Sequence, residues 1–262
     1  MSFLRAFAKS ALPPPVTIRL RAAFKQHEME RALLPALCDP DKTGMDVGAA
    51  LGAYTWPLSR LCKSCIAFEP NIAQAQYLRR AFGDTVRIET TALSNRSGEI
   101  DLVIPQDGNK DLPGQATIDE GASLINKSVR RQKVIMRSLD SFDLGPTGFI
   151  KIDVEGHELA VLQGAANLLQ RDQPTLLIEI EERFATGSIA RVRDFLEPLG
   201  YQGWFLRGSR LYPIAGFDAQ KHQRMEEWGS IPNYINNFIF IAGTKLADCR
   251  TRLARFGYLL DD

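Results

Sequence analysis

Short apolar runs alternate with amphipathic stretches from about residue 44 to residue 180. The apolar runs predict buried strands, and stretches with apolar residues three or four positions apart predict helices. Strands are expected at 45–47, 65–68, 86–89, 148–154 and 175–180, and helices at 54–61, 72–82 and 158–169. Strands that alternate with helices in this way are typical of an α/β domain with a mostly parallel sheet.

The pattern changes in two later regions. Residues 99–104 and 134–137 alternate polar and apolar side chains, as strands do, but prolines and glycines interrupt residues 105–132. A loop of that length often covers a binding site. The strands expected at 201–206 and 237–241 have no helix between them, which predicts an antiparallel end to the sheet. The expected fold is therefore α/β: a doubly wound, mostly parallel seven-stranded Rossmann-like sheet with an antiparallel C-terminal strand.

The N-terminal segment differs from the rest in charge. Residues 1–31 carry six basic and two acidic side chains, and the apolar residues among 3–12 recur at helical spacing. We expect a basic amphipathic helix packed on the main domain; weak contact with an anionic membrane surface and a transit peptide are the alternatives. The expected organisation is a helical extension (1–43), a main domain (44–245) and a C-terminal tail (246–262).

Composition narrows the class of protein. The 262 residues include 32 Lys and Arg against 31 Asp and Glu, a net charge of +1. This balance argues against a nucleic-acid-binding protein built on a broad basic surface, and against a chain disordered by its charge. No apolar run reaches the length that spans a bilayer, and four cysteines are too few for a disulfide scaffold. We expect a cytoplasmic protein that does not bind nucleic acid.

The first candidate site follows the strand expected at 45–47. Asp46 precedes the glycine-containing turn of Gly48 and Gly52, and Glu69 ends the next expected strand. Glycines let a backbone turn sharply beside a ligand, and an acid at the end of the second strand commonly accepts hydrogen bonds from ribose hydroxyls. These residues predict a site for an adenosine-containing cofactor.

Two cofactor classes compete for this site. A nicotinamide dinucleotide would favour a GxGxxG turn for its pyrophosphate, and this chain has only Gly48 and Gly52 there. The carboxylate of Asp46 would also repel that pyrophosphate. S-adenosylmethionine (SAM) carries an ammonium and a sulfonium group, both positive, which a carboxylate attracts. The sequence therefore favours SAM, with an NAD(P)-binding oxidoreductase as the alternative.

The second candidate site follows the strand expected at 148–154. Asp153, Glu155, His157 and Glu158 cluster at the carboxyl end of this strand, where α/β enzymes place their chemistry. Asp153 is expected to face the cofactor, and Glu155 or His157 to take a proton from a substrate hydroxyl. Glu158 is explained equally well as an acid at a helix N-terminus. No metal site is predicted, because strand alternation separates Glu182 from Glu179 and Glu181.

At this point the residues resemble a known family, the FkbM-type SAM-dependent methyltransferases, which have the class I methyltransferase fold. The resemblance spans about residues 44–245. It rests on the blocks DVGAALGAYT (46–55), AFEPN (67–71), TALSNRSGEIDL (91–102), IKIDVEGHELAVLQGA (150–165) and LLIEIEER (176–183). It implies methyl transfer to an oxygen of a sugar, glycan or natural-product acceptor.

The resemblance also implies roles for individual residues. The implied SAM contacts are Asp46, Gly48 and Gly52 at the methionine end, Glu69 at the ribose, Asn71 near the adenine, Ala92, Leu93 and Ser94 along the adenosine, and Asp153 beside the methyl group. One further contact position, Ala50, departs from the family, which usually has Asn there. This departure leaves a non-catalytic SAM-binding protein as an alternative to an enzyme.

Overall fold

The computed structural model describes residues 28–108, 110–112, 116–118, 128–227 and 233–261. The helix expected within residues 1–27 lies outside these ranges, as does most of the expected loop between residues 113 and 127. Among the described residues, no helix combines the length and apolar character needed to cross a membrane.

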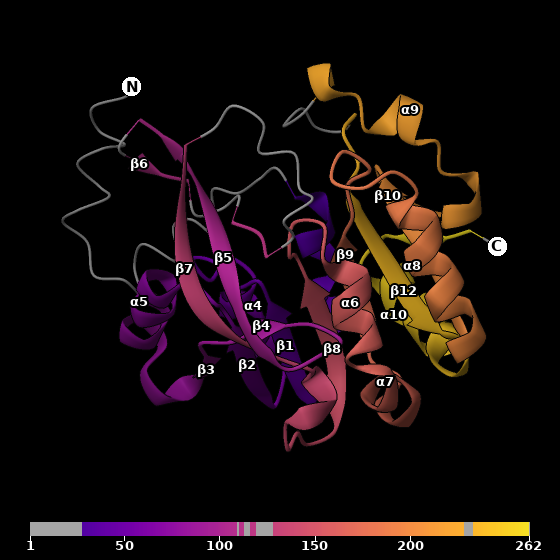
Figure 1. The fold of residues 1–262 in the computed structure, drawn as a ribbon. Coiled ribbons are helices and arrows are strands. Elements are labelled where there is room, and N and C mark those ends of the chain that lie inside the picture. The colour runs from indigo at the N-terminus through magenta and orange to yellow at the C-terminus, as the bar shows by residue number, and fades with distance from the viewer. Residues whose placement is uncertain (1–27, 109, 113–115, 119–127, 228–232, 262) are drawn as a thin grey trace, which may run out of the picture.

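A nine-stranded sheet forms the centre of the molecule (Figure 1). In spatial order its strands are β13 (Leu259–Leu260), β11 (Arg210–Pro213), β10 (Tyr201–Arg207), β12 (Asn237–Ala242), β9 (Thr175–Glu179), β8 (Thr147–Ile152), β1 (Thr43–Val47), β2 (Ser64–Phe68) and β3 (Arg87–Glu89). The five strands from β9 to β3 run parallel. β12 is antiparallel to both β9 and β10. The α/β fold and its antiparallel end are thus confirmed, but the expected number of seven strands is wrong, because the short edge strands β11 and β13 extend the sheet.

Helices cover both faces of this sheet. One face packs against α6 (Glu158–Gln163), α7 (Ala166–Asp172) and α8 (Ser188–Leu196). The other packs against α3 (Leu34–Leu37), α4 (Thr55–Leu61), α5 (Ile72–Phe82) and α10 (Leu246–Arg255). Successive strand residues point to opposite faces, so Ile150 joins the first core and Phe149 the second. Both faces of β8 and β9 are therefore buried.

A second, four-stranded sheet lies beside the parallel strands. Its order is β4 (Ala92–Leu93), β7 (Ser128–Arg137), β5 (Gly98–Asp107) and β6 (Lys110–Asp111). The prediction of a loop over 105–132 is therefore wrong for its first and last residues, which belong to the long β5–β7 hairpin; Pro105, for example, pairs with Val129. Long-range pairing overrides the local signal of Pro105, whose carbonyl oxygen accepts a hydrogen bond from the amide of Leu112 (2.7 Å).

The helix expected at 158–169 is two helices. α6 ends at Gln163 and α7 begins at Ala166. Between them lies Gly164, where a Cβ atom would lie 2.0 Å from the carbonyl oxygen of Ser94. This close approach brings the residues after β4 against the start of α7, and it ties the second sheet to the helix that follows β8.

Candidate functional site

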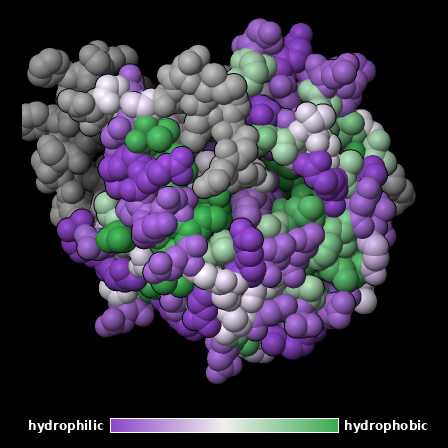
Figure 2. Space-filling model, viewed as in Figure 1, coloured by the Kyte–Doolittle hydropathy of each residue, from purple (hydrophilic) through white to green (hydrophobic). Residues whose placement is uncertain are grey.

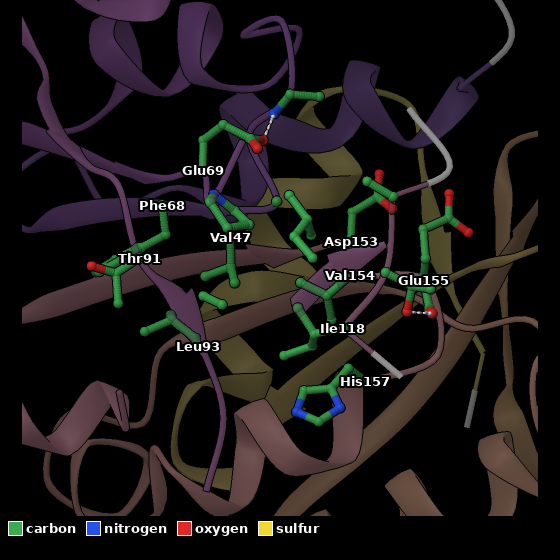
Figure 3. A pocket seen from close by; sticks show the side chains of 17 residues that line it. Val47, Phe68, Glu69, Thr91, Leu93, Ile118, Asp153, Val154, Glu155 and His157 are labelled. Carbon is green, nitrogen blue, oxygen red and sulfur yellow. Dashed lines mark hydrogen bonds between the residues drawn. The ribbon is translucent and has the colours of Figure 1, made fainter. Parts of the chain in front are cut away.

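A pocket opens at the carboxyl ends of β1, β2 and β8, between these strands and the second sheet (Figure 3). Its polar side chains are Glu69, Asp153, Glu155, His157, Thr91 and Thr117. The remaining lining consists of small or apolar residues: Val47, Gly48, Ala50, Phe68, Pro70, Ala92, Leu93, Leu102, Ala116, Ile118 and Val154. Glu69 and His157 lie on opposite sides of this pocket (Figure 3). The pocket is thus mainly apolar, with acids at its edges.

The turn after β1 is held against the turn after β8. Gly48 has φ +82°, and a Cβ atom there would lie 1.8 Å from the carbonyl oxygen of Asp153. The amide of Asp153 donates to the carbonyl oxygen of Val47 (2.9 Å), and the amide of Gly48 donates to that of Phe68 (3.0 Å). Only glycine fits here, because it adopts this φ without strain and has no side chain to collide with Asp153.

Glu69 is fixed by two backbone amides. Its Oε2 accepts from the amide of Ala50 (2.7 Å) and its Oε1 from the amide of Asn71 (2.8 Å). Burial raises the pKa of Glu69 to about 7, although these hydrogen bonds oppose the shift. A carboxylate oxygen accepts more than one hydrogen bond, so each oxygen can also accept from a ligand hydroxyl.

The backbone that supports Glu69 is strained. Ala50 has φ +47°, a left-handed conformation that Cβ disfavours. In this conformation its amide points at Glu69, so the strain occurs at the residue that fixes the acid.

His157 and Glu155 lie on the turn after β8. The Nε2 of His157 is 2.9 Å from the Oγ of Ser94, so the two side chains form a hydrogen bond. Glu155 has φ +49°. Burial and the nearby Asp153 raise the pKa of Glu155 to about 8, against the opposing effect of Arg183, whose guanidinium is 3.9 Å away. Glu155 can therefore exchange a proton near neutral pH.

A buried lysine that was not predicted as a site residue lies behind this turn. Lys151 on β8 is fully buried, and its Nζ lies 3.9 Å from a carboxylate oxygen of Asp153 and 3.9 Å from one of Glu179. The same Nζ donates to Oδ1 of Asn237 (3.1 Å). Its position within an apolar strand could have predicted this, since a buried lysine is usually paired with an acid. Lys151 holds the two acids at the sheet edge.

The structure brings most of the expected site residues together. Those that line the pocket are Gly48, Ala50, Glu69, Ala92, Leu93, Asp153, Glu155 and His157. Ser94 lies behind them and contacts His157. Glu158 does not line the pocket, because its Oε1 accepts from the amide of Gly156 (2.8 Å) at the start of α6.

Besides Ser94, three further expected cofactor contacts are not among the residues that line the pocket. Asp46 lies under α4, where its Oδ2 accepts from the hydroxyl of Thr55 (2.5 Å); burial raises its pKa to about 6. Asn71 caps α5, since its Oδ1 accepts from the amides of Ala73 (3.0 Å) and Gln74 (3.4 Å). Gly52, with φ +81°, serves the turn before α4.

The basic residues at positions 130–133 of β7 are paired with acids. Arg130 forms an ion pair with Asp111 (2.7 Å), and Lys133 forms one with Asp101 (3.1 Å). These contacts stabilise the hairpin. In the described part of the chain, no group of three or more His, Cys, Asp and Glu side chains is arranged to hold a metal ion.

Comparison with known proteins identifies a protein family that the chain matches. The family model described as "Methyltransferase FkbM domain" matches residues 46–202. A structure of methyltransferase FkbM from Methylobacillus flagellatus superposes with a TM-score of 0.50 and 14% identity, over 77% of this chain and 44% of that one. This chain thus spans less than half the length of that protein. No protein of curated function matches the chain significantly.

Two more distant structures were solved with cofactor molecules. A Streptococcus mutans protein named as a candidate methyltransferase, in complex with SAH, has a TM-score of 0.45 and 11% identity, over 81% of this chain and 95% of that one. An M. jannaschii protein in complex with AdoMet has a TM-score of 0.41 and 12% identity, over 82% and 75%. At these identities the likeness is one of fold alone.

Proposed function

The chain belongs to the FkbM methyltransferase family, and we propose that it transfers a methyl group from SAM to a hydroxyl oxygen of a sugar, glycan or natural-product acceptor. One observation carries the proposal. Glu69 and Asp153, at the ends of β2 and β8, face one pocket beside the Gly48 turn. β2 and β8 lie on either side of β1 in the sheet, and the carboxyl ends of neighbouring parallel strands in an α/β sheet are where adenosine-containing ligands bind.

The chemistry of the pocket suits SAM. Glu69 can accept hydrogen bonds from the two ribose hydroxyls, because each of its oxygens uses only one lone pair on a backbone amide. Phe68, Leu93 and Leu102 supply apolar surface for an adenine ring. Asp153 supplies negative charge at the opposite side, which favours the ammonium and sulfonium groups.

When bound, SAM supplies an electrophilic methyl group for in-line substitution. The protein then has to position the acceptor oxygen and remove its proton. His157 is the group we assign to proton removal, since it lies in the pocket and Ser94 orients its ring. Asp153 positions the cofactor, and Glu155, whose pKa is raised to about 8, is the second candidate base.

A labelled-methyl assay tests the proposal. The protein is incubated with SAM labelled in its methyl group and a panel of hydroxylated glycans and natural products, and label is measured in each product. At saturating SAM, the His157→Ala variant is expected to turn over about a hundred- to ten-thousandfold more slowly, the usual contribution of acid–base help. The exposed Asp84→Asn serves as the control. SAM binding without transfer to any acceptor would support the non-catalytic alternative instead.

A further inference from the structure

A second recess lies on the same edge of the main sheet, away from the SAM pocket. It is formed where β10 ends, beside α9 (Ala219–His222) and the 3-10 turn η7 (Met225–Glu227). The strand pairing places the recess on this edge. Glu179, the last residue of β9, pairs with Asn237, the first residue of β12, and the next residue of β12, Phe238, pairs with Phe205 of β10. Arg207, two residues after Phe205, therefore ends β10 at the same edge as the carboxyl end of β9. Hydrophilic side chains gather over α9 at this corner of the molecule (Figure 2).

The recess is basic. Arg207, Lys221 and Arg224 line it together with the single acid Glu227. Lys221 is paired with Asp218 (3.0 Å), and Arg224 is paired with Glu227. Among the described residues, Arg207 has no carboxylate within ion-pair distance. One positive charge is therefore in excess, and an arginine fork suits phosphate and carboxylate groups.

Aromatic rings hold the floor of the recess in place. His222 packs against Phe205 (5.9 Å between ring centroids) and Phe217 (5.4 Å), and Tyr212 stacks on Phe205 (5.9 Å). Phe217 also meets Phe238 edge-on (4.8 Å). The cations therefore surround a floor that is continuous with the hydrophobic core, which favours a defined ligand position over a mobile surface patch.

The distance from the SAM pocket bears on what this ligand is. Asp153 directly follows β8 and Arg207 ends β10, and β9 and β12 lie between these two strands. Three spacings of about 4.8 Å give a separation of about 14 Å along the sheet edge. An extended acceptor can reach both places at once.

We propose that this recess binds an anionic oxygen group, a phosphate or a carboxylate, carried by the methyl acceptor. The inference rests on the proposed function, since it describes the acceptor of that reaction. It narrows the acceptor class from any hydroxylated molecule to an extended, negatively charged one, such as a phosphorylated or acidic glycan. The group that receives the methyl and the anionic group are then about three strand spacings apart.

Binding of small anions to the full chain tests the proposal without any need for turnover. The probes are glucose 1-phosphate, glucuronate, inorganic phosphate and neutral glucose, and the readout is the NMR signal of the His222 ring. The chain has three histidines, so the signal is assigned by its loss in His222→Asn. Arg207→Gln is the test variant. Arg210→Gln is the matched control, because Arg210 lies on the same hairpin but pairs with Asp261 (2.9 Å) and does not line the recess.

We expect saturable shifts of the His222 signal with at least one sugar-linked anion and none with glucose. Affinity should fall about tenfold or more in Arg207→Gln, because a charge-assisted hydrogen bond is lost, and should be unchanged in Arg210→Gln. Absence of any saturable shift, equal affinity in Arg207→Gln, or binding of inorganic phosphate alone would overturn the proposal.

The same variants separate this inference from the proposed function. SAM affinity should be equal in wild type and Arg207→Gln, since the recess is remote from the SAM pocket. If SAM binds and methyl groups are transferred but no sugar-linked anion shifts His222, the inference is wrong and the proposed function stands. If SAM does not bind, the proposed function is wrong whatever the anions do.

Discussion

The backbone of Gly48 passes so close to Asp153 that a Cβ atom on Gly48 would lie 1.8 Å from the Asp153 carbonyl oxygen. The two turns that carry the expected cofactor contacts are therefore in direct contact, and the spacing of Asp153 from the β1 turn depends on a single missing side chain. This relationship makes the Gly48 turn part of the proposed SAM site as well as part of the fold.

Gly48→Ala should damage both stability and SAM binding. The added methyl group must displace the Asp153 backbone, and φ +82° disfavours alanine. We expect the free energy of unfolding to fall by more than about 2 kcal/mol, measured by urea denaturation. Gly145→Ala is the control, because a Cβ there meets nothing within 4 Å, and it should change stability by less than about 1 kcal/mol. Equal effects of the two substitutions would contradict the close contact.

Ala50→Gly should stabilise the protein. The left-handed φ of Ala50 costs an L-residue about 1–2 kcal/mol, and glycine avoids this cost. Glycine also loses more chain entropy on folding, which offsets about 0.5–1 kcal/mol of the gain. A net gain of about 0.5–1 kcal/mol is expected in the free energy of unfolding. Ala254→Gly, at an exposed position of α10, should have the opposite sign. A loss of stability in Ala50→Gly would show that Ala50 is not strained.

Stability should fall as the pH rises from about 6.5 to 8.5. Burial raises the pKa of Glu69 and Glu158 to about 7 and that of Glu155 to about 8. Groups whose pKa is raised on folding stabilise the protein while they are protonated, and this contribution is lost as the pH passes the folded pKa. His222, whose pKa burial lowers, acts in the opposite sense only near and below about pH 6.5.

Urea denaturation at pH 6.5, 7.5 and 8.5 measures this dependence. A pKa shift of one unit corresponds to about 1.4 kcal/mol, so the three acids together should lower the free energy of unfolding by more than about 1 kcal/mol over this range. Glu155→Gln should flatten the curve, whereas Glu99→Gln, at an exposed position of β5, should not. A stability that rises with pH would mean that these acids are ionised in the folded protein.

The positions of the parallel strands and of three acids near their ends could be predicted. Glu69 and Asp153 directly follow apolar runs, and Asp46 lies in the strand expected at 45–47, just before the Gly48 turn. The direction of each side chain could not be predicted. Asp46 points to the α4 side and meets Thr55, while Asn71 turns to cap α5. Both outcomes depend on contacts with helices, which the strand pattern does not encode.

The second sheet was predicted only in part, for a related reason. Strand-like alternation was expected at 99–104 and 134–137. Pro105 and the glycines that follow it indicate a loop locally, yet β5 and β7 pair over nine positions from Gly98 to Gln106. Pairing of this kind depends on the partner strand, so it overrides local propensity. Thr117 and Ile118, which line the pocket from the segment between these strands, carried no signal of their own.

Calorimetric titration of SAM at pH 8 into the wild-type protein and into Glu69→Ala shows whether this pocket is a SAM site, with NAD as the competing ligand and Glu89→Ala as the control on the neighbouring strand β3. We expect SAM to bind and NAD not to bind. Above its pKa of about 7, Glu69 is mostly ionised, and loss of hydrogen bonds to a charged group costs about 1.5–3 kcal/mol. SAM affinity should therefore fall about ten- to a hundredfold in Glu69→Ala and stay unchanged in Glu89→Ala. Binding of NAD without SAM, or equal SAM affinity in wild type and Glu69→Ala, would contradict the assignment of this pocket to SAM.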